Sequence, residues 1–257
     1  MKKLFRSISV SLLLVATVAG LLRATEPETL KVAAAANLSG VMAELKDTFI
    51  ASHKDVKIDV ITASSGKITM QVLSGAPFDV FMSADMENPQ KLKEQGYAAN
   101  DPAIYAFGTL IMFTTKDVDL KKGVSIVTSS EVAKVSIADP NLAPYGKAAV
   151  EALEKLGVLD AAKKKFVTAT NISEVVTQTV NGADLGFTAL SLMYADGIKQ
   201  YNVEGKNWVA VDSTLYSPIR QAIVVLKHGK HKPEAKAFYN FILSKQAGEI
   251  FKKYGYK

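Results

Sequence analysis

The sequence contains no cysteine in its 257 residues. A chain without cysteine has no disulfide bond, no thiolate nucleophile, no cysteine-ligated metal and no cysteine that could carry a lipid. Its folded state must therefore depend on the hydrophobic core. With 48% hydrophobic residues, a chain of this length can bury a core of sufficient size.

Histidine is also scarce, with only His53, His228 and His231, all in polar stretches. No H-x-x-x-H zinc pair, G-x-S-x-G nucleophile elbow or G-x-G-x-x-G dinucleotide motif occurs in the sequence. We therefore expect neither enzyme activity nor a cofactor. The enzyme alternative that stays open is a hydrolase with Ser65 as its nucleophile.

The net charge says little about partners. The whole chain has a formal charge of +6, from 31 basic and 25 acidic side chains. Residues 1–24 hold four of the basic side chains and no acidic one, which leaves 27 against 25, a formal charge of +2, for the rest. Because no basic patch is interleaved with aromatic residues, nucleic acid is not expected as a partner.

The first 24 residues have the composition of a secretory signal peptide. Lys2, Lys3 and Arg6 precede an apolar run over residues 8–22, which four small or hydroxyl residues interrupt. The alternative is a membrane anchor, but the run is shorter than the roughly 20 residues that span a bilayer. We expect export, with cleavage near Ala24 or after Gly20.

Strand-like and helix-like stretches alternate along the rest of the chain, which predicts an α/β protein with mainly parallel sheets and helices on both faces. Two long apolar strands, at 107–114 and 219–226, separate one α/β series from another and are expected to cross between two domains as a hinge. The first domain is predicted to be discontinuous, with residues 25–107 and 219–257, and the second to span residues 108–218.

Several predicted strands pass directly into turns rich in small or hydroxyl residues, and these turns open helices. Such turns offer backbone N–H groups, often with a hydroxyl or an amide, at Asn37, Ser65, Tyr145 and the helix start near Ile172. Ligands of open α/β sheets bind beyond the carboxyl ends of the strands. Without a metal cluster or catalytic pair beside them, the turns predict an oxyanion receptor with donors from both domains.

Five motifs occur together in the order and at the spacing of one protein family: AAAANL at 33–38, ASSG at 63–66, GAPFDVFMSAD at 75–85, DPNLAPYG at 139–146 and DLGF at 184–187. With them the mature chain resembles the periplasmic molybdate-binding proteins of molybdate ABC transporters over essentially its whole length. The resemblance implies a type II periplasmic binding fold, in which a monomer captures molybdate or tungstate in the periplasm. Its partner would be the membrane permease of the transporter, and no cofactor is implied.

The resemblance also implies which residues of this chain bind the oxyanion. The first donor position, often Ser in the family, is Asn37, and Ala36 before it offers an N–H but no hydroxyl. The second Ser of the paired turn is Ser65. The residue between Pro and Gly is Tyr145, and the backbone donor of the later helix is Ile172. A site made of donors alone also disfavours hydrogen phosphate, whose own proton would face a donor.

Alternative roles stay open for some of these residues. Ser65 and Asn37 are also good helix-capping residues, and Tyr145 could pack on the hinge without contacting the ligand. Arg220 stands on a long strand, where a protein carboxylate is favoured over the ligand as its partner. Sulfate has the charge of molybdate and no proton, so the main alternative function is the same fold with a site for sulfate or another oxyanion.

Overall fold

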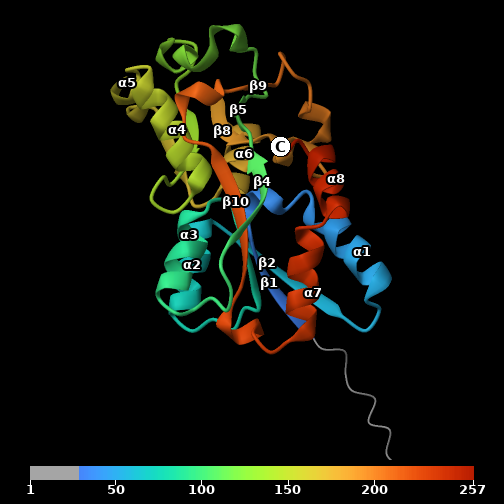
Figure 1. Cartoon of the computed structure of the whole chain (residues 1–257). Coiled ribbons are helices and arrows are strands. Elements are labelled where there is room, and N and C mark those ends of the chain that lie inside the picture. The colour runs from blue at the N-terminus through green and yellow to red at the C-terminus, as the bar shows by residue number, and fades with distance from the viewer. Residues whose placement is uncertain (1–28) are drawn as a thin grey trace, which may run out of the picture.

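The computed structural model describes residues 29–257, so the predicted signal peptide lies outside the described residues. Within this range the chain forms two five-stranded sheets, which lie one above the other in Figure 1. The first sheet has the order β2-β1-β3-β10-β4 and consists of β1 (Thr29–Ala35), β2 (Lys57–Ala63), β3 (Val80–Ser83), β4 (Ala103–Gly108) and β10 (Ile219–Val225).

Helices cover both faces of the first sheet because its strands are apolar on both sides. Along β1, Val32 and Ala34 point to one core cluster and Ala33 points to another. The first cluster is closed by α1 (Met42–Ser52), α7 (Pro233–Ile242) and α8 (Lys245–Lys253). The second is closed by α2 (Ser65–Leu73) and α3 (Glu87–Glu94). A strand covered on both faces is expected to be continuously hydrophobic, as β1 is from Val32 to Ala35.

The second sheet has the order β7-β6-β8-β5-β9, with β5 (Leu110–Phe113), β6 (Val135–Ala138), β7 (Phe166–Ala169), β8 (Leu185–Ala189) and β9 (Trp208–Ala210). One large core cluster joins it to its helices α4 (Pro144–Lys155), α5 (Leu159–Lys163) and α6 (Ile172–Val180). Short 3-10 helices occupy the connections, at Ala36–Leu38, Leu120–Thr128, Leu190–Tyr194, Lys199–Tyr201, Ser213–Leu215 and Lys227–Gly229.

Each sheet is mixed rather than mainly parallel. In the first, β1 pairs in parallel with β2 and β3, whereas β10 runs antiparallel to β3 and β4. In the second, β6 pairs in parallel with β7 and β8, whereas β5 runs antiparallel to β8 and β9. The parallel strands come from βαβ units. The antiparallel ones adjoin the places where the chain enters or leaves a sheet.

The chain crosses between the sheets twice. The first crossing lies at Thr109, between β4 and β5, so the single strand predicted over residues 107–114 is wrong: its two parts pair in different sheets. The second crossing follows β9, and β10 then pairs only within the first sheet. The domain boundaries stay a prediction, since the crossings show where the backbone passes but not which parts fold alone.

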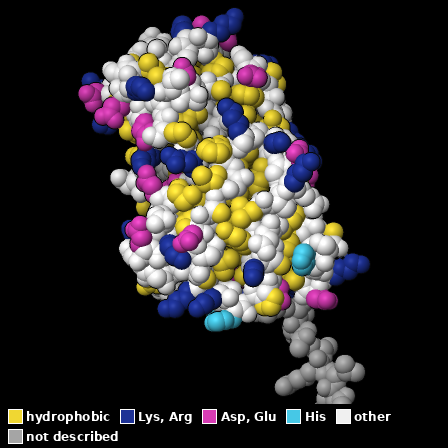
Figure 2. Space-filling view, viewed as in Figure 1, with side chains coloured by type: hydrophobic (Ala, Val, Ile, Leu, Met, Phe, Trp, Pro, Cys, Tyr) yellow, Lys and Arg dark blue, Asp and Glu magenta, His cyan; other side chains and the backbone are white. Residues whose placement is uncertain are grey.

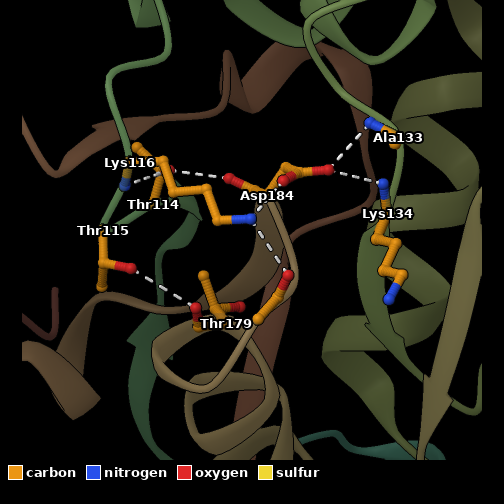
Figure 3. A network of polar contacts seen from close by, with 8 residues as sticks. Thr114, Thr115, Lys116, Ala133, Lys134, Thr179 and Asp184 are labelled. Carbon is orange, nitrogen blue, oxygen red and sulfur yellow. Dashed lines mark hydrogen bonds and ion pairs between the residues drawn. The ribbon is translucent and has the colours of Figure 1, made fainter.

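A partly exposed polar network ties three segments together at the edge of the second sheet where β6 and β8 begin (Figure 3). Asp184, just before β8, accepts hydrogen bonds from the N–H groups of Ala133 and Lys134, each 2.8 Å long, and pairs with the Lys116 ammonium. Its carbonyl accepts from the Thr114 hydroxyl at 2.7 Å. Although burial raises the pKa of Asp184, these donors hold it below its ordinary value. The Asp of the DLGF motif thus has a structural role here.

The described surface carries charges of both signs without a single-sign patch on the face shown in Figure 2, where hydrophobic side chains gather along the middle. Arg220 in β10 is exposed, and no ion pair joins it to a carboxylate within residues 29–257. The expectation of a carboxylate partner was therefore wrong, because an exposed guanidinium is solvated by water. No helix of the described chain is long and apolar enough to cross a membrane.

Candidate oxyanion-binding site

A small cavity lies between the two sheets, where the parallel strands of both end. Residues from β1, β2 and β3 of the first sheet meet residues that follow β6 and β7 of the second. The cavity leaves about 10 Å³ for the centre of a water molecule, which is roughly the room that one water needs. No charged side chain lines it, and its walls are Ala35, Ala36, Asn37, Ser64, Ser65, Ala84, Ala143, Pro144, Tyr145 and Ile172.

All five residues that the sequence assigned to the site lie on this wall: Ala36, Asn37, Ser65, Tyr145 and Ile172. Each is at most 5% exposed. They come from positions as distant in sequence as 36 and 172, and the two sheets bring them together. Their placement makes the predicted site possible, and their contact with a ligand stays a prediction.

The first residues of three helices lie on the cavity wall. The first intrahelical bonds of α2, α4 and α6 are donated by Ile68, Lys147 and Val175, so the N–H groups before them have no intrahelical partner. In α6, the Asn171 side chain caps the N–H groups of Ser173 and Glu174 at 3.0 and 3.1 Å, which leaves Ile172 uncapped.

The start of α4 also has uncapped N–H groups, because the helix begins with Pro144 and has no side-chain cap. The N–H of Tyr145, at its second position, is therefore available to a ligand. Gly146 behind it must be glycine, because a Cβ there would lie 2.1 Å from the Ala138 carbonyl oxygen. Close packing of the helix start on β6 thus places the Tyr145 N–H at the cavity. The negative charge of an oxyanion is also favoured at such helix ends.

Ser65 presents a hydroxyl proton to the cavity. Its Oγ accepts a hydrogen bond from the Ala84 N–H at 3.0 Å, and Ser65 is completely buried. Because the oxygen is already engaged as an acceptor, its proton is the part left to donate. Ser65 is the first residue of α2 and not its cap, since Ser64 precedes it at the N-cap position. The helix-cap interpretation of Ser65 is therefore wrong.

Ser64 is a candidate donor that the sequence analysis did not single out. Its hydroxyl is buried and has no hydrogen-bond partner in the structure, and it does not cap α2. A buried hydroxyl without a partner costs free energy, so it is expected to bind something in the functional state. The paired serines of the ASSG motif were a signal for Ser64 as well as Ser65.

Tyr145 reaches the hinge with its side chain while its backbone lies at the cavity. Its hydroxyl accepts a hydrogen bond from Gln221 Nε2 of β10 at 3.1 Å. A Cβ on Gly108, at the end of β4, would lie 2.1 Å from that hydroxyl oxygen. Burial raises the pKa of Tyr145 well above its ordinary value, so the group stays neutral. Hinge packing and a backbone donor are thus compatible in one residue.

Besides the Tyr145–Gln221 hydrogen bond, four contacts among the described residues hold the two sheets together in a closed arrangement. Ser191 Oγ donates to the Asn37 carbonyl at 2.9 Å, and Ser173 Oγ donates to the Ala36 carbonyl at 3.0 Å. The Gly66 N–H donates to the Leu142 carbonyl, which follows β6 of the second sheet, at 2.9 Å. The fourth contact, at the rim, is an ion pair of 2.6 Å between Lys147 and Glu87.

The carboxylates near the cavity have structural partners. Asp85 accepts from Ser83 and Asn88 at the start of α3, and its burial raises its pKa. Asp79 is fully buried and binds His228 and Lys232 on the far side of the first sheet. Among the described residues no group of His, Cys, Asp and Glu could hold a metal ion. Among residues 29–257, no histidine is a hydrogen-bond partner of Ser65.

Comparison with known proteins gives consistent matches. A family model described as bacterial extracellular solute-binding protein matches residues 30–257. The molybdate-binding protein ModA of Azotobacter vinelandii is 38% identical over 97% of this chain and 98% of its own. ModA of Rhodobacter capsulatus is 39% identical over 75% of this chain and 74% of its own. The solved structure of the Azotobacter vinelandii periplasmic molybdate-binding protein matches with a TM-score of 0.81 at 31% identity, covering 89% of this chain and 98% of that one.

The matches confirm three of the predictions. The resemblance read from the five motifs is confirmed, and so is the two-domain periplasmic binding protein fold. The relatives are named as molybdate-binding proteins, which agrees with the expectation that the chain is not an enzyme. With its match over residues 30–257, the chain belongs to the family of bacterial extracellular solute-binding proteins.

Proposed function

We propose that the protein captures molybdate or tungstate outside the cytoplasm and delivers it to the membrane permease of an ABC transporter. In this proposal the first 24 residues are a cleaved signal peptide and the mature protein is a periplasmic monomer. The relatives named as molybdate-binding proteins support the choice of ligand. One of them, ModA of Azotobacter vinelandii, matches over 97% of the chain.

The observation that carries the proposal is the chemistry of the cavity wall. Its polar groups are backbone N–H groups, the hydroxyls of Ser64 and Ser65, and the Asn37 amide, with no charged side chain among them. A doubly charged oxyanion without a proton suits a wall of donors, because each donor can form a charge-assisted hydrogen bond. Hydrogen phosphate fits less well, since its own O–H would face another donor.

The test is calorimetry on protein purified from the periplasm, with molybdate, tungstate, sulfate and phosphate as ligands. We expect one-to-one binding of molybdate and tungstate, much tighter than that of sulfate, and no measurable binding of phosphate. Sulfate has the same charge, so the size of the cavity must provide the discrimination. Sulfate binding equal to or tighter than molybdate binding would overturn the proposed ligand in favour of the sulfate alternative.

A further inference from the structure

The Asn37 amide is held at its NH2 end by two side chains of the first domain. Its Nδ2 donates to Gln221 Oε1 at 2.9 Å and to the Tyr256 hydroxyl at 3.0 Å. Both amide protons are therefore used away from a ligand. The Asn37 Oδ1 is buried and has no hydrogen-bond partner, in a residue that is 1% exposed and lines the cavity.

This arrangement conflicts with the chemistry of an anion site. An amide oxygen is only an acceptor, and beside an oxyanion it would face the ligand's own acceptor atoms. An unsatisfied buried oxygen also costs free energy by itself. With the NH2 group in its place, Asn37 would instead add a donor to the wall. The heavy atoms of the two ends of an amide occupy nearly the same space, so the exchange needs only a 180° rotation.

Gln221 decides whether that rotation is possible, because it is completely buried and is the hydrogen-bond partner of Asn37. Its Oε1 accepts from Asn37 and from the Tyr105 hydroxyl at 2.9 Å, and its Nε2 donates to the Tyr145 hydroxyl. Rotating Asn37 alone would bring its oxygen against the Gln221 oxygen. Rotating both amides together keeps every one of these distances.

The rotated pair also satisfies its surroundings. Gln221 Nε2 would donate to Asn37 Oδ1 and to the Tyr105 hydroxyl, which donates its own proton to the Ser83 carbonyl at an oxygen–oxygen distance of 3.0 Å. The Tyr145 hydroxyl would donate to Gln221 Oε1. The Tyr256 hydroxyl, which now donates to the Asn37 carbonyl at 3.0 Å, would turn its proton to Asn37 Oδ1, and the Ser191 hydroxyl would still pair that carbonyl. Burial keeps both tyrosines neutral by raising the pKa of each. Only the Asn37 NH2 group would then be left to pair, and it is a donor.

We propose that Gln221 is a positioning residue for oxyanion binding, and that in the ligand-bound protein the amides of Gln221 and Asn37 are both rotated so that Asn37 donates its NH2 group to the ligand. The inference rests on the proposed function for the presence of an oxyanion in the cavity. It adds a residue of the hinge strand β10 to the binding machinery, although Gln221 is not among the residues of the cavity wall.

A double-mutant cycle tests the inference, with molybdate affinity measured by calorimetry on protein purified from the periplasm. Gln221→Met keeps the length of the side chain and removes both polar atoms. We expect it to weaken binding by about tenfold or more in the wild-type background, the typical cost of losing a hydrogen bond to a charged group. In an Asn37→Ser background, which has no amide to orient, the same change should cost less than about threefold.

A matched control removes a buried amide elsewhere. Asn207 is buried in the second domain, where its Nδ2 donates to the Thr114 carbonyl at 3.2 Å. Asn207→Leu should lower the melting temperature and leave the affinity unchanged. If Gln221→Met weakens binding equally in both Asn37 backgrounds, or not at all, Gln221 does not act through Asn37 and the inference is overturned. A wild-type protein that binds neither molybdate nor tungstate overturns the proposed function as well.

Neutron diffraction from deuterated crystals of the molybdate complex tests the rotation directly, without a variant that could fail to fold. Deuterium on the Asn37 atom that faces the ligand is the expected result, together with deuterium on the Gln221 atom that faces Asn37. An Asn37 oxygen facing the ligand, with its NH2 group still on Gln221, would overturn the inference.

Discussion

Ser65 and Asn37 both lie on the cavity wall, but their polar atoms are engaged differently. The Ser65 hydroxyl has its oxygen bound by the Ala84 N–H and its proton free, whereas both amide protons of Asn37 are bound by side chains. The residue types predicted where the site lies. They could not predict which hydrogen bonds these polar atoms form, because Asn37 donates to Gln221 and Tyr256, which are 184 and 219 residues away in sequence.

Ser65→Ala should therefore be more harmful to binding than Asn37→Ser. Removal of the Ser65 hydroxyl leaves one ligand oxygen without a charge-assisted bond, at a cost of roughly 1.5–3 kcal/mol, or about ten- to a hundredfold in affinity. In Asn37→Ser the new hydroxyl can donate in place of the amide, so a smaller loss is expected. Calorimetry with molybdate measures both.

The control for this comparison is the melting temperature without ligand. Ser65→Ala also leaves the Ala84 N–H without its acceptor, so some loss of stability is expected in addition to the loss of affinity. Ser64→Ala removes a hydroxyl that has no partner and should not lower the melting temperature. If Ser65→Ala lowered stability equally with and without ligand, Ser65 would be structural and not a ligand donor.

Among the elements, the predicted alternation of strands and helices is observed in both sheets. The spacing of apolar residues identified a helix where one of its faces packs on a core cluster. Val41, Leu45 and Phe49, for example, all belong to one cluster beside α1. The strand predicted over 107–114 failed because both of its halves are apolar. Nothing in its residue pattern shows that a strand of the first sheet ends at Gly108 and a strand of the second sheet begins at Leu110.

Gly108 marks the first crossing and lets the second domain close on it. In Gly108→Ala the new Cβ would lie 2.1 Å from the Tyr145 hydroxyl oxygen and 2.8 Å from Gln221 Nε2. Tyr145 approaches from the second sheet, so its clash exists only in the closed arrangement, whereas Gln221 lies in the same sheet as Gly108 and the end of its flexible side chain can move aside. We expect the molybdate affinity to fall at least about tenfold, while the melting temperature without ligand changes little.

Gly248→Ala is the matched control for that substitution. Gly248 lies in α8, and a Cβ there would meet nothing within 4 Å. Alanine in a helix interior is favoured over glycine by about 1 kcal/mol, so this variant should be slightly more stable and bind molybdate normally. Normal binding by Gly108→Ala would show that the Tyr145–Gln221 contact is dispensable for closure.

At the scale of the whole molecule, binding should depend only weakly on salt. The cavity wall is neutral, and the nearest ion pair across the cleft, Lys147–Glu87, has side chains 49% and 74% exposed. An exposed pair contributes about 0–1 kcal/mol and is screened by salt. Molybdate affinity between 0.05 and 0.5 M salt should therefore change by less than about threefold. A steep loss would mean that a basic side chain contacts the ligand, with Lys147 at the rim as the first candidate.

Ligand binding should shift the protein toward the closed arrangement. Closing an empty cavity buries Ser64 Oγ and Asn37 Oδ1 without partners, at about 1–3 kcal/mol each. The contacts across the cleft contribute about 1 kcal/mol per hydrogen bond and less for the exposed ion pair, so closure without ligand is close to balanced. An oxyanion forms its full set of hydrogen bonds only when donors of both sheets reach it. It therefore favours the closed state by the free energy of the hydrogen bonds that the open state lacks.

Solution X-ray scattering should show a smaller radius of gyration with molybdate than without it, and a smaller change in Gly108→Ala. Identical profiles for the wild-type protein with and without molybdate would mean that the cleft does not open in solution, and the donors would then have to be reached without a hinge motion.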